Sequence, residues 1–243
     1  MSTQSKVVLV TGASSGIGAA TAARLAREGH RVLAGARRTE RLTELAGSLR
    51  ADGADVRHAS LDVTDPDSVQ AFADLALEQF GRIDVLVNNA GVMPLSPLHE
   101  RRLHEWNQMI DVNVRGVLHG IAAVLPVMRA QGGGHVVNVA SVSGLRVDPT
   151  AAVYSATKFA VRAISEGLRQ ESQDVRVTVV CPGFTRTELT HTGGSPQAQQ
   201  AARAATDQLA ISPGAIAAAI AFAIGQPADV DVNELVIRPT AQG

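Results

Sequence analysis

The chain has 243 residues, of which 45% are hydrophobic, and a formal net charge of -1 at pH 7. This length supports one substantial core, so we expect a single domain over residues 1–243. The balanced charge offers no attraction to nucleic acid or an anionic membrane, and neither partner is expected. Cys181 is the only cysteine, which excludes an intrachain disulfide and favours a cytoplasmic location. The histidines form no H-E-x-x-H or Cys/His cluster, so no metal site is predicted.

Short apolar runs alternate with helical patterns along most of the chain. The runs are continuous rather than alternating in polarity, which predicts parallel strands buried on both faces beneath helices. They are Val7–Val10, Val32–Ala36, Val56–Leu61, Ile83–Val87, His135–Ala140, Val175–Val180 and, more weakly, Leu235–Ile237. Right-handed crossovers between such strands give an α/β fold, a Rossmann-type doubly wound sheet. We expect it to be mostly parallel, with about seven strands and helices on both faces.

Proline and glycine mark several helix boundaries. Asp65-Pro66 and Ser212-Pro213 each place an N-cap residue before a proline at the first helical position. Gly29 and Gly81 stand where helices should end. The segment 184–211 breaks the pattern, because it has few large apolar residues and is rich in Thr, Gln, Gly and Ala. It is either a mobile flap over a binding cleft or a poorly packed surface insertion.

A glycine-rich turn follows the first expected strand and opens the first expected helix. Its sequence is Thr11-Gly12-Ala13-Ser14-Ser15-Gly16-Ile17-Gly18. Glycine permits the tight turn at Gly12, and the missing Cβ at Gly16 and Gly18 lets the backbone approach a pyrophosphate. The helix N-terminus adds free N–H groups and a partial positive charge. A glycine turn without function is the alternative, but the strand–turn–helix context favours dinucleotide binding.

The end of the second expected strand indicates which dinucleotide is bound. An NAD site needs a carboxylate there to accept hydrogen bonds from the ribose hydroxyls. The corresponding residue is Ala36, which cannot do so, and Arg37 follows it. A guanidinium is suited to bidentate contact with a 2′-phosphate, so NADP(H) is preferred over NAD(H). The alternative is that Arg37 and Arg38 begin a solvated helix, and one of the two could do only that.

Three side chains suggest proton-transfer chemistry. Tyr154 and Lys158 are four residues apart, which places them on one helix face. Ser141 follows the carboxyl end of a buried strand, where open α/β sheets bind ligands. A tyrosine phenol titrates at about 10, and a shift of roughly three units, favoured by a lysine ammonium and a nicotinamide cation, would match it to neutral pH. Each residue alone has an ordinary structural explanation, but together with the glycine turn they favour hydride transfer to a carbonyl.

These motifs, in this order, resemble the short-chain dehydrogenase/reductase family over nearly the whole chain. The glycine turn, Asn88-Asn89-Ala90-Gly91, Tyr154-x-x-x-Lys158 and Pro182-Gly183-x-x-x-Thr187 carry the resemblance. It implies that Ser141 holds the substrate oxygen, Tyr154 exchanges its proton and Lys158 lowers the pKa of the tyrosine. It also implies that Asn113 positions Lys158 through a water.

The resemblance further implies which residues contact the cofactor. Asp62-Val63 would meet the adenine ring, and Pro182-Gly183 with Thr187 would flank the nicotinamide carboxamide. The expected cofactor-binding residues are Gly12, Ser14, Ser15, Gly16, Ile17, Gly18, Arg37, Arg38, Asp62, Val63, Asn89, Ala90, Gly91, Tyr154, Lys158, Pro182, Gly183, Thr185 and Thr187.

Three segments look closest to a bacterial subgroup that includes NADP-dependent 3-hydroxy acid (serine-type) dehydrogenases and the clavulanic acid dehydrogenase. They are Glu105–Ile110, Gly120–Pro126 and Arg238–Gln242. Substrates in this subgroup often carry a carboxylate, so we expect a small carboxylate-bearing aldehyde or a 3-oxo/3-hydroxy acid. Arg146 and Arg186 are candidate partners for that carboxylate, and either could equally be a surface arginine.

The apolar helical patterns at Gly116–Ala130 and after Tyr154 resemble helices that family members pair into oligomers, which implies a homotetramer. The alternative is that both helices merely cover the sheet. Two other functions remain open. One is an epimerase or dehydratase on the same fold, and the other is a non-enzymatic NADP(H) sensor.

Overall fold

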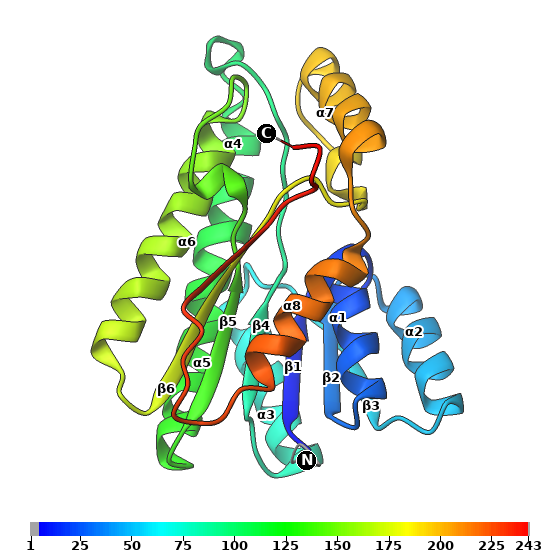
Figure 1. Cartoon of the computed structure of the whole chain (residues 1–243), viewed down its shortest axis with the longest axis vertical. Helices are drawn as coiled ribbons and strands as arrows, with labels where there is room; N and C mark the ends of the chain where they lie inside the picture. The colour runs from blue at the N-terminus through cyan, green and yellow to red at the C-terminus, as the bar shows by residue number, and fades with distance from the viewer. Residues whose placement is uncertain (1–4, 243) are drawn as a thin grey trace.

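The computed structural model describes residues 5–242, so the polar start at 1–4 lies outside it. Within them, seven parallel strands form one sheet in the order β3-β2-β1-β4-β5-β6-β7. The strands are β1 Val7–Thr11, β2 Arg31–Ala36, β3 Val56–Ser60, β4 Val85–Asn88, β5 Gly134–Val139, β6 Val175–Pro182 and β7 Glu234–Ile237. The doubly wound sheet expected from the apolar runs is confirmed, with every strand pairing parallel (Figure 1).

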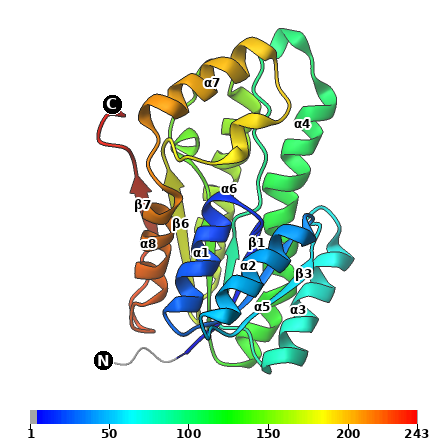
Figure 2. The same cartoon turned by 90° about the vertical axis from the view of Figure 1, so that its right-hand side faces the viewer.

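Helices cover both faces of the sheet. The α-helices are α1 Gly16–Arg27, α2 Thr39–Ala51, α3 Pro66–Phe80, α4 Leu103–Ile110, α5 Gly116–Ala130, α6 Ala152–Glu171, α7 Pro196–Leu209 and α8 Pro213–Ile224. Short 3-10 turns, η1 Leu98–Glu100, η3 Val142–Gly144 and η4 Glu188–His191, join them, and η2 Asp111–Arg115 is a π turn. Helices α1, α2 and α8 pack on one face and α3, α5 and α6 on the other (Figures 1 and 2).

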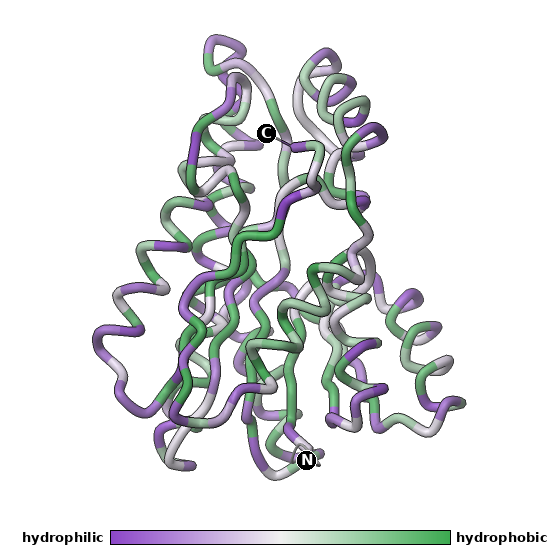
Figure 3. The backbone as a smooth tube through the Cα atoms, in the orientation of Figure 1, coloured by the Kyte–Doolittle hydropathy of each residue, from purple (hydrophilic) through white to green (hydrophobic). Residues whose placement is uncertain are grey.

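Strand β1 illustrates how the sheet separates two cores. Val8 and Val10 point into the core beneath α1, α2 and α8, and Val7 and Leu9 point into the core beneath α3 and α5. This follows from the period of two along a strand. The hydropathy colouring shows the strands largely apolar and the outer helix turns hydrophilic (Figure 3). A strand apolar at every position is therefore stabilised on both sides.

The two edge strands depart from the expectation of burial on both faces. In β3, Val56 is buried whereas Arg57 and Ser60 are exposed. In β7, Glu234 and Val236 are exposed. Each strand has a neighbour on only one side, so its side chains are less covered than those of the interior strands. The prediction of full burial is wrong for β3 and β7 and holds for the interior strands.

The predicted helix boundaries are confirmed. Asp65 accepts a hydrogen bond from the Asp67 backbone N–H at 3.0 Å, and Ser212 accepts one from Gly214 at 3.1 Å. Gly81 ends α3 in the left-handed region at φ 78°, where glycine carries no Cβ penalty. Gly29 has φ 88° and follows the last turn of α1.

The segment 184–211, called the flap below, is more ordered than its composition predicted. It contains η4 and the whole of α7, whose N-cap Ser195 accepts a hydrogen bond from Ala198 and precedes Pro196. The flap lies above the carboxyl edge of the sheet (Figure 2). A helix here was not anticipated, because alanine and glutamine supply a weak apolar stripe.

The run Leu103–Ala130, which joins α4, η2 and α5, is the one stretch among residues 5–242 long and apolar enough to cross a membrane by length and composition. Its α5 part packs against α3, β4 and β5. Helices in the core of a globular protein pass the same test.

Candidate active site

The parallel sheet brings the predicted site residues to one edge. Gly12, Asn89, Ser141 and Gly183 each follow the carboxyl end of a different strand, namely β1, β4, β5 and β6. Open α/β sheets bind ligands at this edge. The dinucleotide motifs and the proton-transfer residues are therefore on the same side of the molecule, under the flap.

The glycine turn leaves the start of α1 open to an anion. The N-cap Ser15 makes no side-chain cap to α1, as is also the case for α2, α4, α5 and α6, whereas α3, α7 and α8 are capped. The first N–H groups of α1 thus keep hydrogen-bonding capacity and positive potential. Gly16 has φ 55°, and a Cβ there would lie 2.9 Å from Thr187 Cγ2. This turn fits a pyrophosphate held between α1 and the flap.

Asn89 ties the β4 end to the glycine turn. Its Nδ2 donates to the Thr11 carbonyl at 2.8 Å, and the Thr11 hydroxyl accepts from the backbone N–H groups of Asn89 and Ala90 at 3.0 and 3.1 Å. A Cβ on Gly12 would come 2.8 Å from Ala90 Cα. These contacts fix the two loops against each other, as expected for a support of the cofactor site.

Ser141, Tyr154 and Lys158 come together in a buried group. They are 9%, 5% and 5% exposed. Tyr154 and Lys158 lie on one face of α6, with the lysine Nζ 5.8 Å from the centroid of the tyrosine ring. Nζ donates a hydrogen bond to the carbonyl of Val139 at 2.9 Å, at the end of β5. The strand end thereby holds the lysine beside the phenol.

Burial dominates the ionisation of this group. It raises the pKa of Tyr154 to about 12, against which a hydrogen bond with the Ser141 side chain acts in the lowering direction. It also lowers the pKa of Lys158 to about 8. The phenol is therefore protonated in the chain without cofactor, and a shift to neutral pH requires further positive charge in the site.

Asn113 sits in the π turn η2 and is fully buried. Its Oδ1 accepts from the Val92 backbone N–H and its Nδ2 donates to the Val92 carbonyl, both at 2.9 Å. Nδ2 also reaches the Thr157 hydroxyl at 3.1 Å, and that hydroxyl donates to the Tyr154 carbonyl at 2.6 Å. Asn113 thus connects to α6 through Thr157, a residue that the sequence did not single out.

Polar side chains also fasten the sheet to α6. Asn88 Nδ2 donates to Asn138 Oδ1 at 2.9 Å, and Asn138 Nδ2 donates to Ser165 Oγ at 2.8 Å. All three side chains are buried, and the Ser165 hydroxyl in turn donates to the Val161 carbonyl at 2.7 Å. Asn88 therefore supports the sheet through two partners that the sequence did not indicate.

The arginines after β2 have different surroundings. Arg38 donates from Nε and Nη2 to Ser14 Oγ at 3.2 and 3.1 Å, and from Nη2 to Ser15 Oγ at 2.8 Å. Arg37 acts electrostatically on Asp62, whose pKa is lowered chiefly by hydrogen bonds from Thr64. Of the two, Arg38 is thus directly linked to the glycine turn.

Other expected cofactor residues line the same edge. Gly91 lies near Lys158, since a Cβ there would be 3.7 Å from Lys158 Nζ. Val63 is buried against Gly116, and its carbonyl is 2.9 Å from His119 Nδ1. Ile17, the second residue of α1, is partly buried and packs against the core on that face.

The turn after β6 is supported by the end of the chain. The Thr185 hydroxyl donates to the Gly183 carbonyl at 3.0 Å, and the Thr187 hydroxyl caps η4. Gln242 Oε1 accepts from the Phe184 backbone N–H at 3.0 Å, and a Cβ on Gly183 would collide with the same oxygen. Gln242 was not anticipated as a site residue, because no motif marks it. It closes over the Pro182-Gly183 turn.

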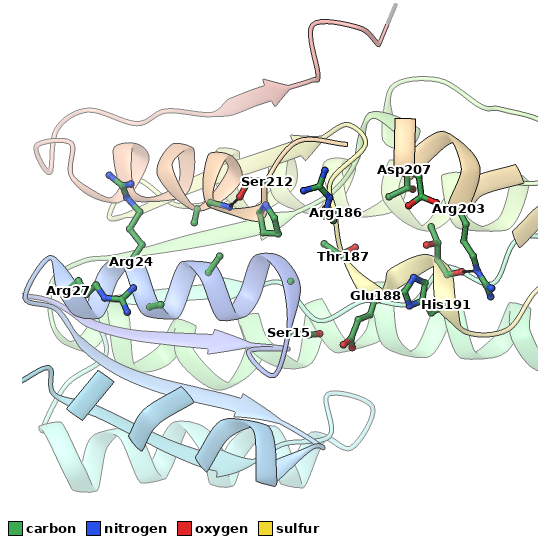
Figure 4. A pocket seen from close by; sticks show the side chains of 18 of the residues that line it. Ser15, Arg24, Arg27, Arg186, Thr187, Glu188, His191, Arg203, Asp207 and Ser212 are labelled. Atoms are coloured by element: carbon green, nitrogen blue, oxygen red, sulfur yellow. Dashed lines mark hydrogen bonds between the residues drawn. The ribbon is translucent and has the colours of Figure 1, made fainter. Parts of the chain in front are cut away.

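A cavity of about 990 Å³ lies between α1, α8 and the flap (Figure 4). Its wall includes Gly16, Thr187 and Arg186 but none of Ser141, Tyr154 and Lys158. The cavity is therefore separate from the group of Ser141, Tyr154 and Lys158. Arg186 faces this cavity, and Arg146 pairs with Asp148 at 3.5 Å on the loop after η3.

The chain matches known proteins over nearly its full length. Residues 6–198 match the family model described as short chain dehydrogenase. An uncharacterized oxidoreductase of Staphylococcus saprophyticus is 49% identical, with 98% of this chain and 97% of that protein covered.

Three solved structures resemble it with a TM-score of 0.89. One is an alcohol dehydrogenase from the archaeon Thermococcus sibiricus with 5-hydroxy-NADP, at 34% identity and 99% coverage of both chains. Another is a serine dehydrogenase with NADP+, at 34% identity, covering 98% of this chain and 96% of that one. The third, from Burkholderia phymatum, holds NAD at 30% identity and covers 97% and 90%. The chain therefore belongs to the short-chain dehydrogenase/reductase family and is an oxidoreductase of CH–OH and carbonyl groups.

Proposed function

We propose that the chain is an NADP(H)-dependent oxidoreductase that interconverts a carbonyl and an alcohol, with Tyr154 as general acid and base. The observation that carries this proposal is the buried group of Ser141, Tyr154 and Lys158 at the carboxyl edge of the sheet, the same edge at which the glycine turn opens α1. Bound NADP(H) would supply or accept the hydride.

The protein groups divide the remaining work. In the reducing direction, the carbonyl oxygen gains negative charge and needs a proton, which the protonated phenol of Tyr154 donates. The Ser141 hydroxyl hydrogen-bonds the same oxygen. In the oxidising direction Tyr154 must act as a base, and Lys158 provides a cation 5.8 Å from its ring centroid. Asn113 acts on this group indirectly, through its hydrogen bonds to Val92 and Thr157.

The preference for NADP(H) rests on charge after β2. Ala36 gives no carboxylate for the ribose hydroxyls, and Arg38 donates hydrogen bonds to Ser14 and Ser15 in the glycine turn. A 2′-phosphate placed there would meet a guanidinium and two hydroxyls. Arg37 is the second cation at the same strand end. The NADP-containing neighbours support this preference, whereas the Burkholderia phymatum neighbour holds NAD.

For the substrate, we propose a small aldehyde, ketone or 3-oxo/3-hydroxy acid that bears a carboxylate. The serine dehydrogenase neighbour supports this class. Arg146, on the loop between Ser141 and Tyr154, and Arg186, at the base of the flap, are the candidate cations. The flap at 184–211 would cover the substrate.

One experiment tests the reaction class and the cofactor together. The oxidation of NADPH is followed by its absorbance, with a panel of aldehydes, ketones and 3-oxo acids as substrates. The same panel is run with NADH. Turnover with NADPH well above that with NADH supports the proposal, and the rates across the panel rank the substrates. NADPH binding without turnover on any compound would argue for a sensor, and cycling without net oxidation would argue for an epimerase.

We also propose a homotetramer. Leu103, Ile110 and Leu118 on the α4–α5 run and Phe159 on α6 are large apolar side chains left exposed. Exposed apolar surface of this kind is covered when helices pair between subunits. Sedimentation equilibrium measures the mass, and a mass of one chain would contradict the proposal.

A further inference from the structure

Glu188, the first residue of η4 in the flap, reaches across to the start of α2. Its Oε2 accepts from Arg38 Nη1 at 2.7 Å, and its Oε1 accepts from Arg41 Nη1 at 2.5 Å. Each carboxylate oxygen therefore takes one guanidinium. These contacts connect the flap to the end of β2, some 150 positions away in sequence.

Arg38 joins this pair to the glycine turn. The same guanidinium that binds Glu188 also donates to the hydroxyls of Ser14 and Ser15. Two guanidinium groups therefore hold one anion, and one of them, that of Arg38, is itself held by the two serine hydroxyls. In this set the anion is a carboxylate of the chain itself, and Figure 4 shows Glu188 beside Ser15, where the flap meets the start of α1.

The carboxylate of Glu188 stays charged at ordinary pH. Hydrogen bonds from Arg38 and Arg41 lower the pKa of Glu188 to about 2. A 2′-phosphate that approaches Arg38 therefore meets a carboxylate of like sign and must separate it from the guanidinium. A ribose with a free 2′-hydroxyl carries no charge with which to do so.

We propose that Glu188 occupies the place of the 2′-phosphate in the free protein and limits the affinity for NADP(H), an inference that rests on the proposed cofactor. When the phosphate binds, it takes over Arg38 and Arg41 and releases η4. Glu188 is thus a cofactor-discriminating residue, although it lies on the flap and not at the strand end. It also makes this one attachment of the flap, which is held elsewhere by Glu105 and Met93, depend on the 2′-phosphate.

The test uses two probes that lack the nicotinamide half, so that the rest of the site stays out of the measurement. Isothermal titration of adenosine 2′,5′-bisphosphate and of AMP into the cofactor-free chain compares wild type with Glu188→Gln. The matched control is Glu166→Gln, because Glu166 is likewise held by an arginine, Arg169, on α6 and has a pKa of about 2. We expect Glu188→Gln to bind the bisphosphate about three- to tenfold tighter, as for loss of exposed ion pairs. AMP binding and the control should stay at wild-type values.

The outcomes separate the two proposals. If neither wild type nor Glu188→Gln binds the bisphosphate more tightly than AMP, the NADP(H) assignment fails. If wild type prefers the bisphosphate but Glu188→Gln binds it equally or more weakly, only the role of Glu188 fails.

A second readout is trypsin cleavage of the flap at Arg186 and Arg203. The bisphosphate, but not AMP, should accelerate it in wild type, and Glu188→Gln should be cleaved rapidly without ligand. Equal cleavage rates in unliganded wild type and unliganded Glu188→Gln would contradict the proposal that Glu188 holds the flap.

Discussion

The ammonium nitrogen of Lys158 lies 5.8 Å from the centroid of the Tyr154 ring, one turn further along α6. Burial lowers the pKa of the lysine to about 8 and raises that of the tyrosine to about 12. Lys158 thus remains mostly protonated at neutral pH, whereas Tyr154 is held in its neutral form. Charge on Tyr154 depends on what enters the site, which couples the proton chemistry to cofactor binding.

Lys158 should make the chain more stable as the pH rises above about 8. Its pKa is lower in the folded chain than the ordinary value of 10.5, so the unfolded state binds more protons between these values. The contribution of Lys158 to the free energy of unfolding therefore increases with pH across that window, on the order of 1–3 kcal/mol, whereas Cys181, whose pKa burial raises to about 11, acts in the opposite direction. Urea unfolding of wild type and of Lys158→Met below and above the window isolates the lysine, because Cys181 is common to both and the increase should be smaller in the variant. An unchanged increase in that variant would refute the assignment.

Replacing Tyr154 by Phe removes the transferable proton but keeps the ring. Turnover should fall about 10²- to 10⁴-fold, the usual contribution of general acid–base catalysis. NADPH binding, followed by fluorescence, should persist, because the glycine turn and Arg38 are untouched. Retention of near-native turnover with a reactive substrate would show that another group transfers the proton.

Arg38 should govern the choice between cofactors more than Arg37, because Arg38 contacts Ser14 and Ser15. In Arg38→Ala the KM for NADPH should rise about 10- to 100-fold, with little change for NADH. Arg37→Ala should have a smaller effect in the same direction. Steady-state kinetics with both cofactors measures this, and equal effects on NADPH and NADH would rule out 2′-phosphate recognition.

Gly16→Ala should weaken binding of both cofactors. The residue has φ 55°, and the added Cβ would press on Thr187, so the turn must shift away from the pyrophosphate position. Gly47→Ala is the control, because it lies in α2 with open space around it. That change should stabilise the fold by about 0.5–1 kcal/mol. If cofactor titrations give identical dissociation constants for the two variants, the turn is not the pyrophosphate site.

Arg146→Ala and Arg186→Ala test the substrate class. If either guanidinium binds a substrate carboxylate, its loss should lower kcat/KM about tenfold or more for acidic substrates and leave neutral ones unchanged. Arg186 lines the cavity beside α1 and α8, whereas Arg146 lies beyond Ser141. If the ratio of kcat/KM for acidic substrates to that for neutral substrates is unchanged in both variants, the proposal of an acidic substrate loses its support.

The sequence predicts those parts of the fold that depend on local pattern. Apolar runs located all the strands, and proline after Asp65 and Ser212 located two helix starts. The same signal at Ser195-Pro196 was missed, since the helix that follows is rich in alanine and glutamine. Exposure of β3 was also missed, because an edge strand is defined by the absence of a neighbour, which no local pattern records.

Within the candidate site, the sequence predicts the residues that belong to motifs. Thr157, Gln242 and Glu188 carry no motif, and their partners are far away along the chain. Glu188 meets Arg38 only because β1 and β2 are neighbours in the sheet and the flap closes over their ends. Such contacts follow from topology rather than from spacing.

The hydrogen bond from the Phe184 N–H to Gln242 has a practical consequence for handling the protein. A linker or affinity tag fused at the carboxyl end must depart beside the turn that follows β6, and it would compete with this contact. A tag at the amino end leads into β1 from the opposite edge of the sheet, away from the flap (Figure 1). Kinetic work should therefore use an amino-terminal tag.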